Sequence, residues 1–218
     1  MRVFCPTFRP LLFAALRERL AGVEVVPVDG HGALEAGRSK ASLFNKCIRA
    51  AFDSGEDVAI VSTEKMLACK ADVERAFRMV AVERYGAAAF CSWSFFAIDR
   101  ETIRRVGWFD ETFPGAGYED SDYLRRCCFR DVGIYVSHEV GALAIESAWP
   151  DDEPARQYLR HCWEDDIDAK LFRRKRPVAI GDPNLPLGSQ ALPLKPWHET
   201  LAMSWEGKNE YLGEWRVA

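Results

Sequence analysis

The sequence predicts an α/β fold in which a mostly parallel central sheet is flanked by helices. Short apolar segments of strand length alternate with segments whose apolar residues recur at helical spacing. Turn residues separate them, among them Gly22, Asp29-Gly30 and Ser54-Gly55. A chain of 218 residues, 48% hydrophobic and 28% charged, is long enough to bury one substantial core. Alternating strands and helices are typical of right-handed crossovers, which build parallel sheets with helices on both faces.

The first half of the chain contains three predicted strand–helix pairs. The predicted strands are residues 2–5 (RVFC), ended by Pro6, residues 23–28 (VEVVPV) and residues 57–61 (DVAIV). The residues that define the helical spacing are Leu11, Leu12, Leu16 and Leu20, then Leu43, Ile48 and Phe52, and finally Val73, Phe77 and Val80.

Further elements are predicted in the second half. A fourth strand is expected at residues 88–92, helices at 100–105 and 120–130, and short strands at 134–136 and 142–145. Residues 150–175 are charged and have a helical pattern, and the chain after Pro177 is rich in Pro and Gly. We therefore expect one domain over residues 1–150, with residues 151–218 as a helical and irregular extension packed on it.

Composition excludes some classes of function. The net charge of -4 argues against broad binding to nucleic acid or anionic membrane, although residues 172–176 (FRRKR) are a local basic candidate. The seven cysteines include no CxxC pair and are expected to be buried and reduced. The longest apolar stretch, residues 87–98, is too short to span a bilayer, and no secretion signal is recognisable. These features predict a soluble, cytoplasmic protein without stable membrane insertion.

Residues 107–122 (GWFDETFPGAGYEDSD) place two acidic pairs around a loop of Pro and Gly among aromatic residues. Acids in the first turn of a helix are favoured by capping and by the helix dipole, so both pairs could simply start helices. Capping alone does not require Gly115, Gly117 and the aromatic residues, which favours a functional role for Glu119-Asp120. We expect Asp110-Glu111 to hold the loop.

Ligands of parallel sheets bind beyond the carboxyl ends of the strands. Here that rule selects Pro6-Thr7, Asp29-Gly30 and Ser62-Thr63-Glu64. Neither GxGxxG nor GxxxxGK[ST] occurs, so the common dinucleotide and P-loop fingerprints are absent from the sequence.

The segment 96–126 (FAIDRETIRRVGWFDETFPGAGYEDSDYLRR) resembles the family 2 inverting glycosyltransferases, which have the GT-A fold. In that family a helix and Gly-Phe-Asp-Glu precede a Glu-Asp-x-Asp helix. Weaker similarity covers Cys5-Pro6-Thr7, Asp29 and Asn45, and the resemblance extends over residues 2 to about 150. It implies transfer of a sugar from a nucleotide diphosphate donor to an acceptor hydroxyl, with inversion.

The resemblance also implies roles for individual residues. Asp120 would be the general base, and Glu119 would orient the acceptor or the base. The nucleotide would be bound at Pro6, Thr7, Asp29 and Asn45, although Asp29 could simply be a turn residue. Trp93 and Tyr118 would contact the sugar or the acceptor, although a buried core Trp is the commoner case.

In the resembling family a divalent metal neutralises the diphosphate and is held by Asp-x-Asp. Mn²⁺ or Mg²⁺ prefers carboxylate oxygens, but this chain has Ser62-Thr63-Glu64 at that position. Glu64 could hold the metal alone, with Lys65 partly compensating, or the protein works without metal or has lost activity. Glu64-Lys65 could equally be a surface pair. His138 and Glu146 are the candidates for a further metal ligand.

Two other functions stay open. A non-catalytic protein that binds nucleotide-sugars or carbohydrates is suggested by the missing Asp-x-Asp. A nucleotidyltransferase is less favoured, because that class typically has a Gly-rich loop after its first strand and residues 6–10 contain no glycine. The acceptor of a transferase could be a glycan, a small molecule or a macromolecule.

Overall fold

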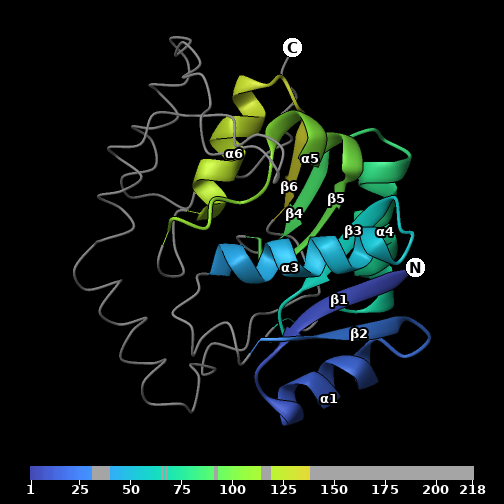
Figure 1. The fold of residues 1–218 in the computed structure, drawn as a ribbon. Coiled ribbons are helices and arrows are strands. Elements are labelled where there is room, and N and C mark those ends of the chain that lie inside the picture. Colours follow the sequence, from blue (N-terminus) through green and yellow to red (C-terminus); the bar gives the residue numbers. More distant parts are fainter. Residues whose placement is uncertain (31–39, 65, 67, 91–92, 114–118, 138–218) are drawn as a thin grey trace.

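The computed structural model describes residues 1–30, 40–64, 66, 68–90, 93–113 and 119–137. Within these ranges six strands form one sheet in the order β2-β1-β3-β5-β4-β6 (Figure 1). The strands are β1 (Arg2–Thr7), β2 (Glu24–Asp29), β3 (Val58–Ser62), β4 (Ala87–Phe90), β5 (Phe95–Asp99) and β6 (Ile134–Ser137). The helices are α1 (Pro10–Arg19), α3 (Lys40–Asp53), α4 (Lys70–Ala81), α5 (Arg100–Val106) and α6 (Glu119–Phe129).

The sheet is mostly parallel. β1 pairs in parallel with β2 and β3, and β4 pairs in parallel with β6. β5 lies between β3 and β4 and runs antiparallel to both. The predicted class, an α/β fold with a mostly parallel sheet flanked by helices, is therefore confirmed.

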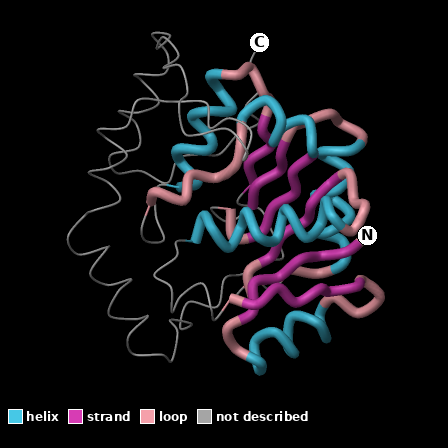
Figure 2. The backbone as a smooth tube through the Cα atoms, viewed as in Figure 1, coloured by secondary structure: helices cyan, strands magenta, loops and turns pink. Residues whose placement is uncertain are grey.

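Helices cover both faces of the sheet, as Figure 2 shows. Because successive strand residues point to opposite faces, Val3 and Cys5 of β1 join one core and Phe4 joins the other. The core containing Val3 includes residues of α1 and α4, and the core containing Phe4 includes residues of α3, α5 and α6. The candidate acidic residues at the start of α6 therefore lie on the same side of the sheet as α3.

Local signals explain where several helices begin and end. α1 begins at Pro10, whose missing N–H costs nothing in the first turn. Asp99 caps α5 by accepting a hydrogen bond from the Thr102 N–H at 2.6 Å. α5 ends at Gly107, whose φ of 89° lies in the left-handed region that favours glycine.

Two predicted boundaries were wrong. The first concerns β1, which was expected to end at Pro6. It continues to Thr7, because Pro6 still lies opposite Val28 of β2. Its register with β3 is at Phe4 and Val61, before the proline. The second error concerns the apolar run 87–98, which contains β4 and β5 rather than a single strand at 88–92. Trp93 lies between these strands with a φ of 59°, in the turn that reverses the chain.

Other expectations fall outside the described residues. These are the strand at 142–145, the helical pattern at 150–175, the domain boundary at residue 150 and the extension that follows it. In the part of the chain that the structure describes, no helix has the length and apolarity needed to cross a membrane. Of the described cysteines, Cys5, Cys47, Cys127 and Cys128 are buried as predicted, whereas Cys69 is half-buried.

Candidate active site

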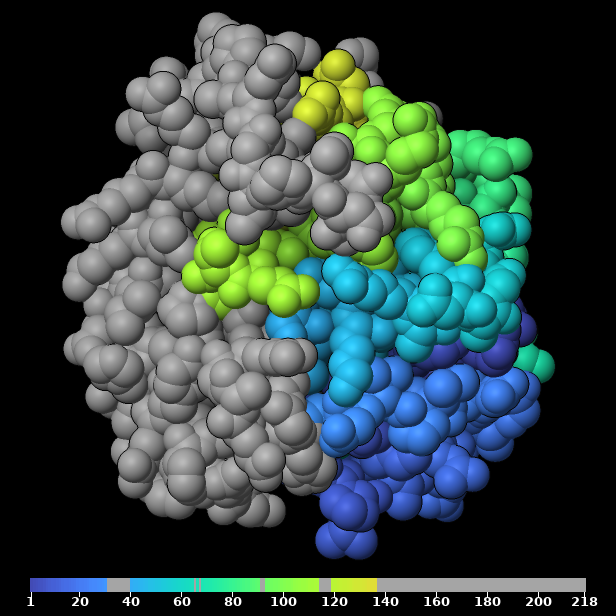
Figure 3. Space-filling model, viewed as in Figure 1, coloured from blue at the N-terminus to red at the C-terminus, as the bar shows by residue number. Residues whose placement is uncertain are grey.

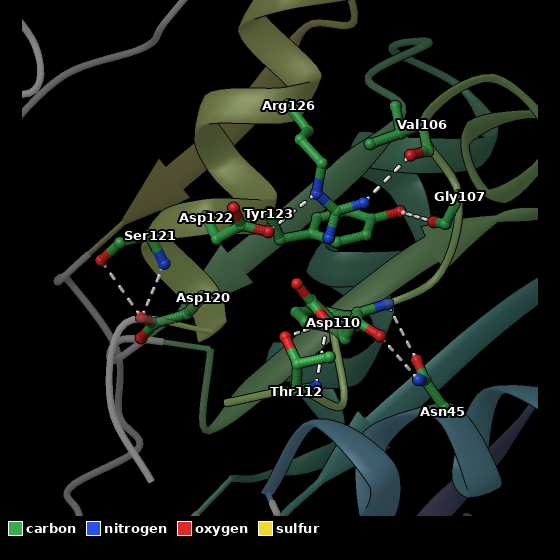
Figure 4. A network of polar contacts seen from close by, with 11 residues as sticks. Asn45, Val106, Gly107, Asp110, Thr112, Asp120, Ser121, Asp122, Tyr123 and Arg126 are labelled. Atoms are coloured by element: carbon green, nitrogen blue, oxygen red, sulfur yellow. Dashed lines mark hydrogen bonds and ion pairs between the residues drawn. The ribbon is translucent and has the colours of Figure 1, made fainter. Parts of the chain in front are cut away.

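The acidic pair Glu119-Asp120 forms the first turn of α6, where the helix dipole favours negative charge. Asp120 is, as a whole residue, partly exposed. Its Oδ1 accepts hydrogen bonds from the Ser121 backbone N–H at 2.7 Å and from the Ser121 hydroxyl at 3.3 Å (Figure 4). One oxygen of Asp120 is thus held by its neighbour.

Glu119 has a different environment, because its side chain is fully buried. Lys40, the first residue of α3, places its Nζ 3.1 Å from Glu119 Oε1. The same ammonium lies 5.1 Å from the centroid of the Phe44 ring, within cation–π range. Glu119 Oε2 has no hydrogen-bond partner in the described ranges.

These charges act on one another. Burial raises the pKa of Asp120 to about 6, Glu119 contributes in the same direction, and Lys40 and Ser121 oppose the rise. Burial on its own would lower the pKa of Lys40, but the attraction of Glu119 and Asp120 outweighs it and raises the pKa of this ammonium. The three side chains therefore form one electrostatic unit that joins α3 to α6.

The loop before α6 is fixed by Asn45 of α3. Asn45 Nδ2 donates to the Phe109 carbonyl and to Glu111 Oε1, both at 2.9 Å, and Asn45 Oδ1 accepts from the Phe109 N–H at 2.9 Å. Asp110 Oδ1 accepts from the backbone N–H and the hydroxyl of Thr112 at 2.9 and 2.7 Å. Figure 4 shows Asn45, Asp110 and Thr112 below the α6 helix. The prediction that Asp110-Glu111 holds the loop is confirmed, and the sequence did not indicate that Asn45 is its partner.

Asp122, Tyr123 and Arg126, which follow in α6, connect the helix to the segment before the same loop. The Tyr123 hydroxyl donates to the Gly107 carbonyl at 3.0 Å, and its ring stacks on Phe109 with centroids 4.2 Å apart. Arg126 pairs with Asp122 at 2.8 Å and donates to the Val106 carbonyl at 3.0 Å, with all these atoms buried. None of these roles was predicted. The Asp122–Arg126 pair has the i,i+4 spacing of a helix, whereas the Gly107 and Val106 carbonyls belong to a segment 16 and 20 residues away, which a sequence pattern does not reveal.

The carboxyl ends of β1 and β2 hold the predicted nucleotide-binding residues. Pro6 is buried, and the partly buried Thr7 donates its hydroxyl to the Val28 carbonyl at 3.3 Å. The exposed residue Asp29 accepts a hydrogen bond on its backbone carbonyl from Lys46 of α3 at 2.7 Å. Nucleotide binding at Thr7 and Asp29 stays a prediction.

Helix α3 connects these strand ends with the acidic pair. Lys46 reaches β2, and Lys40 reaches α6. Six residues of helix span about 9 Å along the axis, so the first two turns of α3 carry both contacts. In Figure 3 the beginnings of α3 and α6 are side by side on the visible face.

Glu64 has a structural role in the described residues. Its Oε2 accepts hydrogen bonds from the backbone N–H groups of Phe8 and Arg9 at 2.9 and 3.0 Å, and its Oε1 lies 4.0 Å from Arg9 Nε. The side chain is 4% exposed. A carboxylate that already binds two N–H groups and faces a guanidinium does not fit a site for a divalent cation. The described ranges contain no cluster of three His, Cys, Asp or Glu residues that could hold a metal.

Trp93 packs into the core. It is 4% exposed and contacts the rings of Phe96, Phe109 and Tyr123, with centroids 5.4 to 5.5 Å apart. The structure thus favours the core interpretation that the sequence left open, and contact with substrate stays a prediction. Tyr118, His138 and Glu146 lie outside the described residues.

No protein-family model and no curated protein matches the chain. Among solved structures it is similar to the protein A197 from STIV, with 13% identity and a TM-score of 0.45, covering 66% of this chain and 84% of that one. It is also similar to a proposed nucleotide-diphospho-sugar transferase from Desulfovibrio desulfuricans G20, with 11% identity and a TM-score of 0.42, covering 78% of this chain and 96% of that one.

Proposed function

We propose that this protein is a GT-A-type glycosyltransferase that moves a sugar from a nucleotide diphosphate sugar to an acceptor hydroxyl, with inversion. The observation that carries the proposal is Asp120, a partly exposed residue at a helix start whose carboxyl pKa is raised to about 6 by burial. Perturbed carboxylates of this kind are typical of general acids and bases. The acceptor is a glycan, a small molecule or a macromolecule with a free hydroxyl.

The reaction needs a base because a hydroxyl is a weak nucleophile until its proton is accepted. Asp120 takes this proton while the acceptor oxygen forms a bond to the anomeric carbon, and the bond from that carbon to the nucleotide diphosphate breaks. Attack from the face opposite the leaving group inverts the configuration. A carboxylate with a pKa near 6 is ionised at neutral pH and is a stronger base than an ordinary aspartate.

The donor is proposed to bind beyond the carboxyl ends of β1 and β2, with Thr7 and Asp29 contacting the nucleotide. Support comes from the first two turns of α3, in which Lys46 contacts the carboxyl end of β2 and Lys40 contacts the acidic pair. Dependence on Mn²⁺ or Mg²⁺ is a separate prediction, and no step of the proposed reaction relies on Glu64 as a ligand.

The substitution Asp120→Asn tests the base directly. It keeps the size of the side chain and an oxygen for the Ser121 N–H, but it cannot accept the proton. We expect the turnover number to fall by about 10²- to 10⁴-fold, with unchanged donor affinity and an unchanged circular dichroism spectrum. Asp53→Asn, at an exposed position at the end of α3, is the matched control. Turnover retained in Asp120→Asn would exclude Asp120 as the base.

A non-catalytic protein that binds nucleotide-sugars is the second candidate. It is favoured by Ser62 in place of the first acidic residue of Asp-x-Asp in the resembling family, and by the contacts that occupy Glu64. Donor hydrolysis, measured with a panel of UDP, GDP, CMP and dTDP sugars in EDTA and in Mn²⁺, distinguishes the two. Saturable binding without hydrolysis or transfer under either condition would favour the binding protein.

A further inference from the structure

The fully buried carboxylate of Glu119 requires a counterion. An ionised carboxylate removed from water without a partner is unstable and takes up a proton instead. Lys40 Nζ lies 3.1 Å from Glu119 Oε1, and the Lys40 side chain is itself largely buried, with 24% exposure. In the described ranges Lys40 is the cation paired with Glu119.

Asp120 is placed differently from Glu119 although the two are adjacent. It is partly exposed and bonded to Ser121, whereas Glu119 is fully buried against Lys40. The charged groups that act on Asp120 from the described elements are Glu119 on α6 and Lys40 on α3. A proton arriving from solvent or from a bound hydroxyl therefore reaches Asp120 more easily than Glu119.

We propose that Lys40 is a positioning residue that holds Glu119 as an ion inside the protein and thereby leaves proton exchange to Asp120. This inference rests on the proposed function only in giving Asp120 the role of base. Lys40 acts through Glu119 and does not contact the reacting atoms. Its distance from Glu119, the burial of Glu119 and the exposure of Asp120 together support this arrangement.

Loss of the Lys40 charge should shift the titration midpoint of Asp120 in one direction. In Lys40→Met the buried Glu119 takes up a proton, so Asp120 loses the neighbouring negative charge as well as the ammonium. Glu119 raises the pKa of Asp120 more than Lys40 lowers it. The titration midpoint of Asp120 must therefore move to lower pH when both charges disappear. Were Glu119 to stay ionised, the midpoint would move to higher pH.

The test is a ¹³C-carboxyl NMR titration of the full chain, which needs neither donor nor acceptor. We expect the highest Asp120 midpoint in the wild type and in Lys40→Arg, which keeps the charge. Lys40→Met and the double variant Lys40→Met/Glu119→Gln should share a lower midpoint, because Glu119 is neutral in both. Glu119→Gln, which keeps the ammonium, should have the lowest. Lys70→Met removes the same charge from the exposed start of α4 and should leave the midpoint unchanged.

An Asp120 midpoint in Lys40→Met that stays the same or rises would overturn the proposal. So would a clear difference between Lys40→Met and the double variant, since position 119 is proposed to be neutral in both. If Lys40→Met does not fold, the double variant should fold, because it buries no unpaired charge, and an unfolded double variant contradicts the proposal. Retained turnover in Asp120→Asn would refute the proposed base while the NMR result for Lys40 still stood, so the two failures are distinguishable.

Discussion

The side-chain amide of Asn45 fixes the loop that leads to α6. It is 2% exposed, and its two atoms make three hydrogen bonds, two of them to the buried backbone of Phe109. The resemblance assigned Asn45 to the nucleotide, whereas the structure places its amide on this loop. Spacing along the chain could identify Asn45 as unusual but not its partners, because Phe109 belongs to a distant segment.

Replacing Asn45 with alanine should destabilise the fold markedly. The Phe109 N–H and carbonyl would be left unpaired in the core, and each such group costs about 1–3 kcal/mol. We expect the free energy of unfolding, measured with urea, to fall by about 2–4 kcal/mol. Glu111→Ala is the control, because it removes only the exposed partner of the same amide and should change stability by less than about 0.5 kcal/mol. Equal effects of both substitutions would contradict the assigned role.

The helices and strands could be predicted where periodicity and turn residues agreed. β1, β2 and β3, each separated by a helix and a turn, lie within one or two residues of the predicted positions. β5 was missed because the run 87–98 is apolar except for Ser92 and Ser94 and contains no Gly, Pro or Asn to mark a reversal. The reversal includes Trp93 at positive φ, a conformation that its residue type does not signal.

The acidic residues of the candidate site could be predicted because their signals are local in the sequence. Glu119 and Asp120 lie in a recognisable local motif at a helix start, and Asp110 bonds to Thr112 two residues away. Lys40 could not be selected from the other cations of its region, because only the packing of α3 against α6 brings it to Glu119.

The contact of Glu64 with the residues before α1 gives a prediction that distinguishes a structural role of Glu64 from a role as metal ligand. Glu64→Ala leaves the N–H groups of Phe8 and Arg9 without their carboxylate and should reduce the free energy of unfolding by about 1–3 kcal/mol. Glu64→Gln keeps an oxygen acceptor and should lose less. Urea unfolding with and without Mn²⁺ provides the measurement. Stabilisation by Mn²⁺ that is present in the wild type and lost in Glu64→Ala would identify Glu64 as a metal ligand after all.

The molecule as a whole keeps several charges inside the layer formed by α3 and α6. Glu119, Asp122 and Arg126 are each at most 1% exposed. Burial and the neighbouring Glu119 raise the pKa of Asp120. Arg126 and Asp122 pair with each other, and Lys40 pairs with Glu119, but Asp120 is held mainly by Ser121. The rest of the fold must therefore offset the cost of ionising Asp120, as is common for residues kept for function rather than stability.

This cost predicts how the stability of the protein depends on pH. Asp120 titrates near pH 6 when folded and near its ordinary value of about 3.9 when unfolded. Between these values the folded state binds the extra proton, so stability is lost as pH rises through 6. The loss by pH 8 is at most about 3 kcal/mol. Asp120→Asn has no such titration, so urea unfolding should show the variant gaining stability relative to wild type between pH 4 and pH 8. A difference that stays constant over this range would mean that the raised pKa of Asp120 does not hold in the folded protein.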